Sequence, residues 1–274
     1  MKRLIVTADD FGRAVPINEA VADAHKRGIL TSASLMVTGD AFADAVVRAR
    51  KLPDLSVGLH LTLVDGKPIL PPQVIPDLVR ADGRLTDRLV SLGARIYLDH
   101  NVRRQVEEEI HAQFHAYLDT GLALGHVDAH HHYHLHPTVF DILLPIAVGY
   151  GCPAIRIPWE PLLPHGLFHL RRARKMRREA RQAGLICNDR IFGVAHSGKM
   201  DSRRLSSLIA ALPEGLSEIY CHPATRDWDL RPLPGHYRTR EEYRALVDPA
   251  TMDKVRRSGV LLTSFAAEAR RALA

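Results

Sequence analysis

Residues 3–12 read RLIVTADDFG, an apolar run that ends in two carboxylates, an aromatic residue and a glycine. The apolar part, Arg3–Ala8, predicts a buried strand, and the stretch after it, Ile17–Lys26, has the spacing of an amphipathic helix. The same order of strand and helix returns at Thr31–Val37 and Phe42–Lys51. Short strands that alternate with helices are typical of a parallel α/β sheet.

The alternation continues to the end of the chain. Further strands are expected at Ser56–Leu61, Leu124–Asp128, Ala154–Ile157, Leu185–Val194, Ser217–Cys221 and Val260–Thr263, and further helices at Val102–Thr120, Pro137–Tyr150, Arg171–Arg181, Ser202–Ala211, Arg240–Val247 and Pro249–Ser258. Between them, Thr62–Asp99 is rich in proline and is predicted to be a long irregular loop with a functional role. Seven or eight such units in 274 residues indicate a distorted (β/α)7–8 TIM-like barrel, closed or nearly closed, with residues 1–274 as one domain.

The bulk composition is that of an ordinary globular protein, with 46% hydrophobic and 25% charged residues. No apolar run approaches the roughly 20 residues needed to cross a bilayer, and the apolar part of the first residues is too short for a signal peptide. The three cysteines are far apart and show neither a disulfide framework nor a metal-binding pair. We therefore expect a cytoplasmic protein.

Much of the net charge of +6 comes from one basic run at Arg171–Arg181. The simplest interpretation is the solvated face of a helix. The alternative is a surface for an anionic membrane, which would place the protein peripherally on the inner face of that membrane. No nucleic-acid-binding motif accompanies the charge, so nucleic acid is not an expected partner. The oligomeric state is open, with a homodimer among the alternatives.

Charged and histidine side chains directly follow several of the predicted strands. They are Asp9 and Asp10 after the first strand, His60 at the end of the third, Asp128 and His130 after the fourth, and His222 after Ser217–Cys221. In a parallel barrel the carboxyl ends of the strands converge on one face, and that face carries the active site. Four distant segments can therefore meet at one point.

The segment Gly125–Pro137 contains six of the 16 histidines of the chain. Imidazole is a common ligand for zinc and similar ions, and catalytic metal sites often use three protein ligands with one position left for water. Asp10, His60 and His130 are the expected ligands because they come from three different strand ends. His134 is the competitor of His130, since residues four apart share one face of a helix. A histidine-rich surface loop with incidental metal affinity is the competing interpretation.

Asp9 and Asp10 are adjacent, so in an extended strand their side chains would point to opposite faces. A turn at the strand end, which Gly12 would allow, can bring both to the site. One carboxylate could then hold a metal while the other takes a proton from water. His222 taken alone is as often structural as catalytic, and its neighbour Cys221 is expected to be a buried strand residue.

Four motifs stand out: TADDFG at residues 7–12, GLHL at 58–61, HVDAHHH at 126–132 and CHP at 221–223. Together, and in this order and spacing, they resemble the YdjC-like carbohydrate deacetylase family, which includes the chitooligosaccharide deacetylases. More narrowly, segments 6–12, 33–37, 57–61, 68–72, 134–138 and 218–225 resemble the hopanoid-biosynthesis-associated members. Those proteins are implicated in removing acetyl from an N-acetylglucosaminyl hopanoid lipid.

The resemblance implies a distorted (β/α) barrel with one divalent metal ion on Asp10, His60 and His130. This ligand set fits Zn²⁺, and Mg²⁺ is the alternative. The resemblance also implies that Asp9 acts as the base and His222 as the acid in removing the N-acetyl group of an N-acetylglucosaminyl substrate. The hopanoid lipid is the favoured substrate and a soluble chitooligosaccharide is the alternative.

Three further residues are expected around these groups. Asp128 would orient a ligand histidine through its second nitrogen. Arg156, after the fifth predicted strand, would contact the substrate or Asp9, or would form a salt bridge within the barrel rim. His134, where it is not a ligand, would lie near the substrate or behind the ligands. A non-catalytic metal-binding protein and a metal phosphoesterase are the rival functions.

Overall fold

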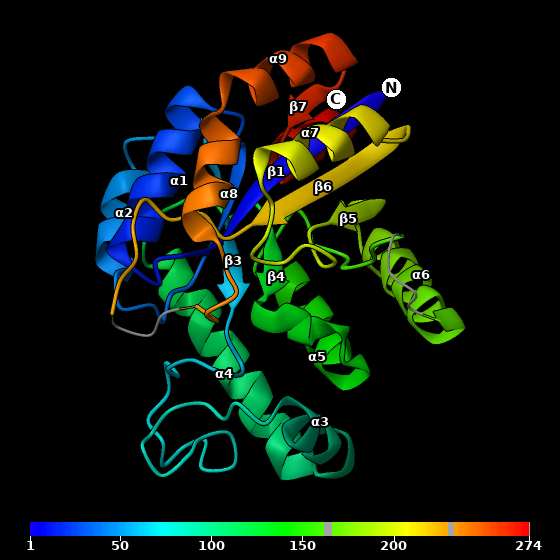
Figure 1. The fold of residues 1–274 in the computed structure, drawn as a ribbon. Helices are drawn as coiled ribbons and strands as arrows, with labels where there is room; N and C mark the ends of the chain where they lie inside the picture. Colours follow the sequence, from blue (N-terminus) through cyan, green and yellow to red (C-terminus); the bar gives the residue numbers. More distant parts are fainter. Residues whose placement is uncertain (162–165, 230–232, 274) are drawn as a thin grey trace.

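The strands of the described residues form one curled sheet in which every strand pairing is parallel, with β1 (Lys2–Phe11) near the middle (Figure 1). The computed structural model describes residues 1–161, 166–229 and 233–273. The order across the sheet is β4-β3-β2-β1-β6-β5, and β7 pairs with the first half of β1. The remaining strands are β2 (Ser32–Leu35), β3 (Ser56–Leu61), β4 (Val127–Ala129), β5 (Arg190–Phe192), β6 (Gly215–Cys221) and β7 (Leu261–Thr263).

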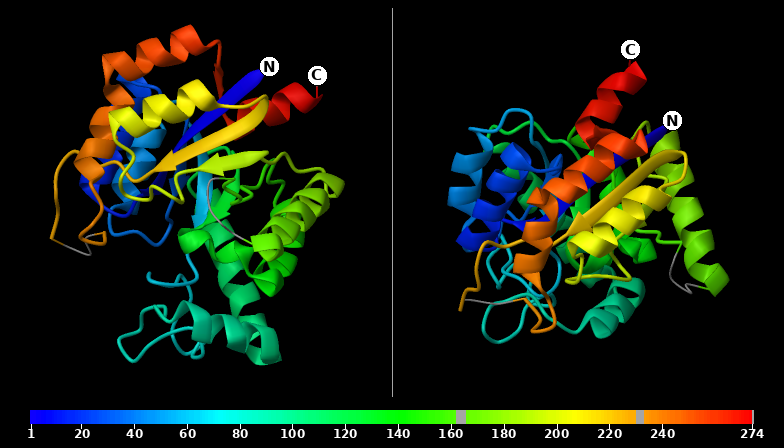
Figure 2. Two further views of the ribbon diagram at one scale, coloured as in Figure 1. Left: turned by 45° about the vertical axis from the view of Figure 1, so that its right-hand side comes forward. Right: turned by 45° about the horizontal axis from the view of Figure 1, so that its top comes forward.

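Helices surround the outside of the curled sheet (Figures 1 and 2). Those before the basic run are α1 (Val15–Arg27), α2 (Phe42–Ala49), α3 (Leu89–Leu98), α4 (His100–Leu118), the 3₁₀ helix η1 (His130–Leu135) and α5 (Pro137–Gly149). The later ones are α6 (Gly166–Gln182), α7 (Ser202–Ala211), α8 (Thr239–Val247), α9 (Pro249–Ser258) and α10 (Phe265–Leu273). The predicted α/β class is confirmed, and most predicted elements recur with ends that differ by a few residues.

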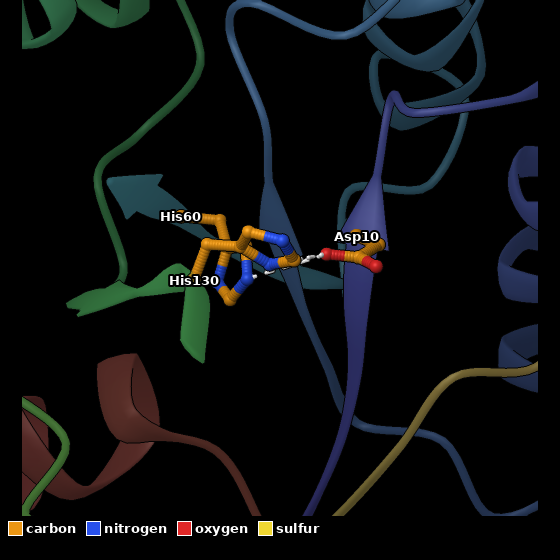
Figure 3. A group of neighbouring side chains, drawn as sticks. All are labelled: Asp10, His60 and His130. Carbon is orange, nitrogen blue, oxygen red and sulfur yellow. Dashed lines mark ion pairs between the residues drawn. The ribbon is translucent and has the colours of Figure 1, made fainter. Parts of the chain in front are cut away.

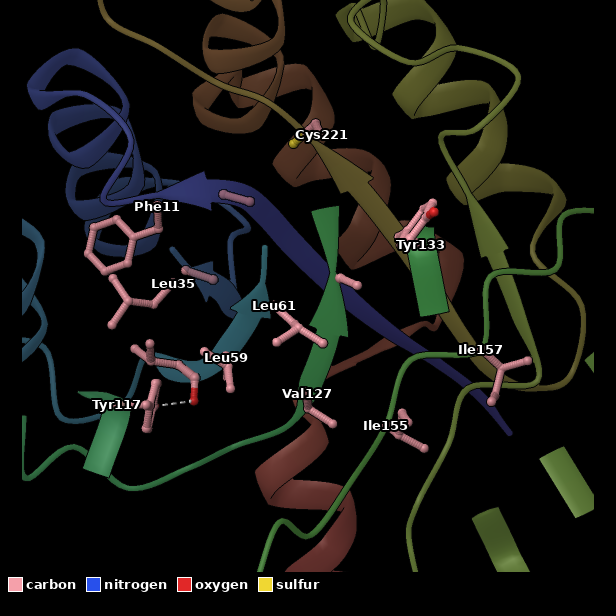
Figure 4. Close-up of a cluster of buried hydrophobic side chains, with 14 of the residues drawn as sticks. Phe11, Leu35, Leu59, Leu61, Tyr117, Val127, Tyr133, Ile155, Ile157 and Cys221 are labelled. Carbon is pink, nitrogen blue, oxygen red and sulfur yellow. Dashed lines mark hydrogen bonds between the residues drawn. The ribbon is translucent and has the colours of Figure 1, made fainter. Parts of the chain in front are cut away.

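The core lies between the sheet and these helices. Phe11, Leu35, Leu59 and Leu61 come from three neighbouring strands and are fully buried in one cluster, together with Tyr117 of α4 (Figure 4). The hydroxyl of Tyr117 donates a hydrogen bond of 2.9 Å to the carbonyl oxygen of Val57 and so satisfies its own polar atom inside the core. Burying one large apolar side chain stabilises a fold by about 1.5–3 kcal/mol. A slip of one residue would turn these side chains to the other face of the sheet, so the cluster favours the observed register of β1, β2 and β3.

The sheet does not close into the predicted barrel. Within the described ranges, the gap between β4 and β5 is spanned by isolated bridges, which join Val127 to Ile155 and Ala154 to Ile186. The predicted fifth strand, Ala154–Ile157, is therefore wrong as a regular strand. The architecture is a half-barrel that keeps the strand direction of a TIM-like barrel and leaves one side irregular.

Two prolines explain why this segment pairs poorly. Pro153 and Pro158 flank Ala154–Ile157, and neither has an N–H group to donate to a neighbouring strand. Ile157 donates its backbone N–H to the side chain of Asn188, at 2.7 Å, in place of a backbone partner. The side-chain amide of Asn188 thus supplies the acceptor that a regular strand partner would otherwise supply.

Two of the α-helices in the described ranges lie outside the predicted elements. Helix α3 occupies the end of Thr62–Asp99, which the sequence predicts to be irregular, and it buries Leu92 and Ile96. Figure 1 shows α3 and the cyan stretch before it projecting away from the sheet, beside α4. Helix α10 follows β7 and buries Phe265. The apolar spacing in α3 is short and follows several prolines, so the sequence alone favours a loop there. Packing of α3 against α4 stabilises the helix.

The basic run forms part of α6, as predicted. Arg171, Arg174, Lys175 and Arg178 are exposed. Arg172 differs, because it is buried and donates to the carbonyl oxygens of Leu135 and Pro137, both at 3.3 Å. None of the helices in the described ranges combines the length and apolarity that a membrane span requires.

Candidate active site

The carboxyl ends of β1, β3, β4 and β6 border a cavity of about 220 Å³. Five of the predicted site residues line it: Asp9, Asp10, His60, His130 and His222. A larger cavity of about 600 Å³ is lined by residues of the segment 77–95 and includes none of the predicted site residues. The reactive side chains are thus gathered in the smaller cavity, at the strand ends where the sequence predicts them.

Asp10, His60 and His130 turn one ligand atom each toward a common point (Figure 3). Asp10 Oδ1 lies 3.4 Å from His60 Nε2 and 3.2 Å from His130 Nδ1, and the three ligand atoms lie within 4.8 Å of one another. All three residues are buried. Asp10 Oδ1 accepts no hydrogen bond from any described residue, an expensive state for a buried carboxylate oxygen. One carboxylate and two imidazoles with a free oxygen between them fit a divalent cation.

The electrostatics of this group point the same way. Burial by itself would raise the pKa of Asp10, but His130 and Arg13 outweigh it and hold the pKa well below its usual range. Burial lowers the pKa of His60, yet the carboxylates of Asp128 and Asp10 more than compensate and raise it to about 10. The group therefore strongly favours added positive charge, which either a proton or a metal cation can supply.

The backbone at Asp10 brings both neighbouring carboxylates into the cavity. Asp10 has a φ of +62°, and the pairing of β1 with β2 shifts register between Ala8 and Phe11. This left-handed residue breaks the alternation that would point Asp9 and Asp10 to opposite faces. Gly12 follows with a φ of +95°, and a Cβ there would approach the Met36 carbonyl oxygen to 2.9 Å. The predicted turn at the strand end is confirmed.

Left-handed backbone is concentrated at the cavity. The described non-glycine residues with positive φ are Asp10, Asp65, His131 and His132, and all of them line it. Each such conformation costs of order 1–3 kcal/mol and persists only where the surrounding structure enforces it. Strain of this kind gathers at functional sites, which supports the cavity as the site of chemistry.

Asp128 contacts the second nitrogen of a ligand histidine. Its Oδ1 lies 2.8 Å from His60 Nδ1, and its Oδ2 accepts a hydrogen bond of 2.9 Å from Ser34. The Ser34 hydroxyl also lies 3.1 Å from His126 Nε2, so a buried polar chain extends behind His60. Such a carboxylate fixes both the tautomer and the ring orientation of a metal-binding histidine.

Arg156 lies at full burial behind the cavity and contacts three carboxylates. Its two terminal nitrogens each donate to one oxygen of Asp9 at 2.8 Å, which is a bidentate pair. It also donates to Glu218 at 2.8 and 3.1 Å and forms an ion pair with Asp128. Thr7 completes the cluster with a hydrogen bond of 2.7 Å to Glu218. Of the predicted roles for Arg156, contact with Asp9 and a salt-bridge network occur together.

His134 does not pair with His130 on a helix face. The left-handed residues His131 and His132 interrupt η1, so the expected spacing of four residues does not align the two rings. His134 is fully buried, and its Nε2 lies 2.9 Å from the carbonyl oxygen of Arg156. Burial lowers its pKa to about 4. His134 therefore supports the backbone under Arg156 and takes no place among the cavity-lining residues.

His222 lies on the wall of the cavity at the end of β6. Its ring centroid is 5.0 Å from that of Tyr237 and 5.6 Å from that of Tyr220. Its backbone N–H donates a hydrogen bond of 2.6 Å to Glu242. Burial lowers the pKa of His222, although the nearby Asp10 and Asp9 oppose that effect. The ring Nδ1 is buried and makes no hydrogen bond to the described part of the chain.

Several residues that line the cavity are not predicted from the sequence. Arg13 Nη1 lies 3.4 Å from Asp10 Oδ2 and 3.5 Å from His130 Nε2. Asp65 Oδ2 lies 3.4 Å from His131 Nε2 and 3.9 Å from His130 Nε2. Contacts with these two histidines hold the pKa of the Asp65 carboxyl well below its usual range. Neither residue carries a signal of its own in the sequence, since Arg13 lies just after the TADDFG motif and Asp65 is one residue of the long predicted loop Thr62–Asp99.

Glu218 and Tyr220 are not predicted either, although a signal exists. Residues two apart in a strand share a face, so Glu218 and Tyr220 lie on the same face of β6, which continues at His222. The strand alternation therefore extends the site inward from the predicted histidine to the carboxylate that binds Arg156.

Comparison with known proteins gives a consistent result. The model of the YdjC-like proteins matches residues 3–257. A carbohydrate deacetylase from Geobacillus stearothermophilus is 32% identical over 95% of this chain and 96% of its own length. A chitooligosaccharide deacetylase from Serratia marcescens is 30% identical over 96% of this chain and 98% of its own length.

A solved structure extends the likeness to three dimensions. It is a protein from Enterococcus faecalis V583, provisionally named a cellobiose-phosphate cleavage protein. It superposes with a TM-score of 0.79 at 26% identity and covers 100% of this chain and 99% of that one. The half-barrel described above is thus shared along the whole length of both chains.

Proposed function

This chain belongs to the YdjC-like family, and from that membership and the cavity we propose that it is a metal-dependent carbohydrate deacetylase that hydrolyses the N-acetyl group of an N-acetylglucosaminyl substrate. The observation that carries the proposal is the convergence of Asp10, His60 and His130 on one point, with the carboxylate of Asp9 beside them. Relatives named carbohydrate deacetylase and chitooligosaccharide deacetylase support the reaction class.

The metal would be held by Asp10, His60 and His130. When bound there, Zn²⁺ or Mg²⁺ supplies Lewis acidity, which polarises an acetyl carbonyl and makes water a better nucleophile. Asp128 would keep the His60 ring oriented through the 2.8 Å contact with Nδ1. Two nitrogens and one oxygen favour Zn²⁺, and Mg²⁺ is the alternative.

Asp9 would accept the proton of the attacking water. Both of its oxygens are held by Arg156 at 2.8 Å, which fixes the plane of the carboxylate at the cavity wall. Each carboxylate oxygen has two lone pairs, so one remains on each atom for a water molecule. The water oxygen then joins the acetyl carbon while its proton moves to Asp9.

His222 would protonate the departing amine as the carbon–nitrogen bond breaks, so that acetate and a free amino sugar are the products. A histidine whose pKa burial has lowered is a stronger acid when protonated, although a smaller fraction carries the proton at neutral pH. Tyr220 and Tyr237 flank this ring and present aromatic surface to a sugar. The cavity is smaller than the roughly 300–1,000 Å³ of pockets for drug-sized ligands, which favours one terminal sugar ring.

The identity of the group attached to that sugar stays a prediction. The narrower resemblance to hopanoid-associated members favours a glycolipid, and the chitooligosaccharide deacetylase among the relatives favours a soluble oligosaccharide. Membrane contact through α6 would involve exposed Arg171, Arg174, Lys175 and Arg178, whereas the buried Arg172 belongs to the fold. Glutamine at those four exposed positions should weaken binding to anionic liposomes and spare hydrolysis of a soluble substrate. Unchanged liposome binding would count against the membrane role.

The deciding experiment measures acetate release from di-N-acetylchitobiose and from an N-acetylglucosaminyl lipid. We expect release by the wild type, its loss in chelator and its return when Zn²⁺ or Mg²⁺ is added back. Asp9→Asn should lower the rate by about 10²–10⁴-fold while metal content is kept. The matched control is Asp54→Asn, at an exposed position, which should match the wild type.

The rival functions give different results in the same experiment. A non-catalytic metal-binding protein would hold metal and release no acetate from either substrate. A metal phosphoesterase would release phosphate from simple esters instead. Acetate release that persists in chelator would sink the metal-dependent mechanism, even if the chain is a deacetylase.

A further inference from the structure

Glu242, in α8, is a buried carboxylate that no step above uses. It is 1% exposed, whereas the side chain of its neighbour Glu241 is 46% exposed and pairs with Arg238 on the surface. Burial raises the pKa of Glu242 to about 7. Taking a carboxylate out of water is expensive, so its retention in the interior calls for a specific contact.

Each oxygen of Glu242 holds a different segment of the cavity wall. Oε1 accepts a hydrogen bond of 2.8 Å from the backbone N–H of Met200, and Oε2 accepts one of 2.6 Å from the N–H of His222. The segment before Met200 supplies Val194 and Ser197 to the cavity, and His222 lines the cavity itself. One side chain thus joins two cavity-lining segments that α7 and β6 separate in the chain.

His222 needs this acceptor because the strand ladder ends one residue before it. The pairing of β6 with β1 runs from Gly215 to Cys221, where Cys221 is opposite Ala8. The next N–H, on His222, is buried beyond the last strand partner and would cost free energy if it were left unpaired. Glu242 supplies the acceptor that a neighbouring strand would otherwise supply. It also places Oε2 4.0 Å from His222 Nδ1.

We propose that Glu242 is the positioning residue of His222, which holds the backbone of that histidine so that its ring meets the leaving nitrogen. The inference rests on the proposed deacetylase function. Glu242 touches neither substrate nor metal in this scheme and acts only through His222. An apolar residue of similar volume would fill the same space with a smaller desolvation cost but could not hold the N–H groups of both segments.

The test uses two substrates that differ in their need for an acid. The amine of di-N-acetylchitobiose must be protonated as it leaves, whereas the nitrophenolate of p-nitrophenyl acetate leaves without a proton. Glu242→Gln keeps the shape but replaces one acceptor oxygen by an amide donor. We expect kcat for acetate release from the amide to fall about 10–100-fold with KM little changed, as for loss of acid assistance. Hydrolysis of the ester should stay within about twofold of the wild type, on the same reasoning.

Two further variants separate positioning from general damage. Glu241→Gln, one residue away and exposed, should behave as the wild type on both substrates. Glu242→Asp has a shorter carboxylate that can reach one of the two N–H groups, so it should show a smaller loss with the same selectivity. It also provides the measurement if Glu242→Gln does not fold.

Double substitution gives the sharpest outcome. If Glu242 acts through His222, the variant His222→Ala/Glu242→Gln should be no slower on the amide than His222→Ala alone. Losses that multiply, or an equal fall on amide and ester, would overturn the positioning role and leave the deacetylase proposal intact. A wild type that releases no acetate would overturn the proposed function, and this inference with it.

Discussion

Two buried charge clusters meet at the floor of the cavity, and they differ in the origin of their positive charge. Behind the cavity, Arg156 contacts Asp9, Asp128 and Glu218, so a guanidinium built into the chain neutralises the carboxylates. At the front, Asp10 lies between His60 and His130, and its Oδ1 has no donor among the described residues.

The difference indicates which cluster the chain itself holds in one arrangement and which is able to take up a cation. A permanent guanidinium with short bidentate hydrogen bonds fixes its carboxylates in one arrangement. Ligand atoms that converge without a built-in cation between them remain able to take up an ion from solution. Asp128 belongs to both clusters, since it contacts Arg156 and His60, and it therefore sets the distance between them.

The largest effect is expected from removing the built-in cation. Arg156→Met would leave three buried carboxylates without their guanidinium, and removal of one partner from a buried ion pair costs about 3–5 kcal/mol. We expect a loss of at least that size in the free energy of unfolding, measured by urea titration of the metal-free protein. Arg156→Lys keeps the charge and should lose less. An Arg156→Met variant that unfolds at the wild-type urea concentration would contradict the structural assignment of this cluster.

A smaller effect is expected from the front cluster. With a free Zn²⁺ concentration 100 times its Kd, binding should raise the free energy of unfolding of the wild type by about 2.7 kcal/mol. Asp10→Asn removes one ligand and should abolish most of this gain. The gain is measured for each protein against its own stability in chelator, because losing the contacts of Asp10 with His130 and Arg13 also lowers the stability of the metal-free variant. Equal stabilisation of both proteins by Zn²⁺ would mean that the ion binds elsewhere.

The smallest effect is expected from His134, whose Nε2 lies 2.9 Å from the carbonyl oxygen of Arg156. Its pKa is about 4 in the folded protein and 6.5 as the ordinary value, so between these values the unfolded chain binds a proton that the folded chain does not. Stability from neutral His134 is therefore complete above pH 6.5 and is lost as the pH falls toward 4. Relative to His134→Gln, the wild type should lose about 1.4 kcal/mol between pH 8 and pH 5.5. A difference that does not vary with pH would show that His134 is protonated alike in both states.

The convergence of strand ends is the part of the site that the sequence predicts well. Asp10, His60 and His130 each follow an apolar run that must be buried, and parallel strands leave their carboxyl ends on one side. This rule alone predicts that the three side chains lie together. The position of His222 follows from the same rule, since it directly succeeds β6.

What the sequence could not supply are the contacts that depend on exact backbone angles and on distant partners. The left-handed conformation of Asp10 decides that Asp9 also faces the cavity, and no residue type at that position signals it. The carboxylate that holds His222 comes from Glu242, which looks like its exposed neighbour in an ordinary helical pattern. The predicted barrel was closed or nearly closed, and the sheet stops short of closure because two prolines limit hydrogen bonding at one edge, a local effect that a count of strands does not include.

The left-handed residues around the cavity also bear on protein engineering. Glycine adopts such backbone angles without the penalty that histidine incurs, so His131→Gly or His132→Gly would be expected to relieve strain. A laboratory selection for higher thermal stability would therefore favour substitutions at His131 and His132, because a single substitution at either position can relieve backbone strain. The more stable variants would be expected to lose activity, as stabilised enzymes often do. Mutant libraries for this protein are therefore better directed to its outer helices.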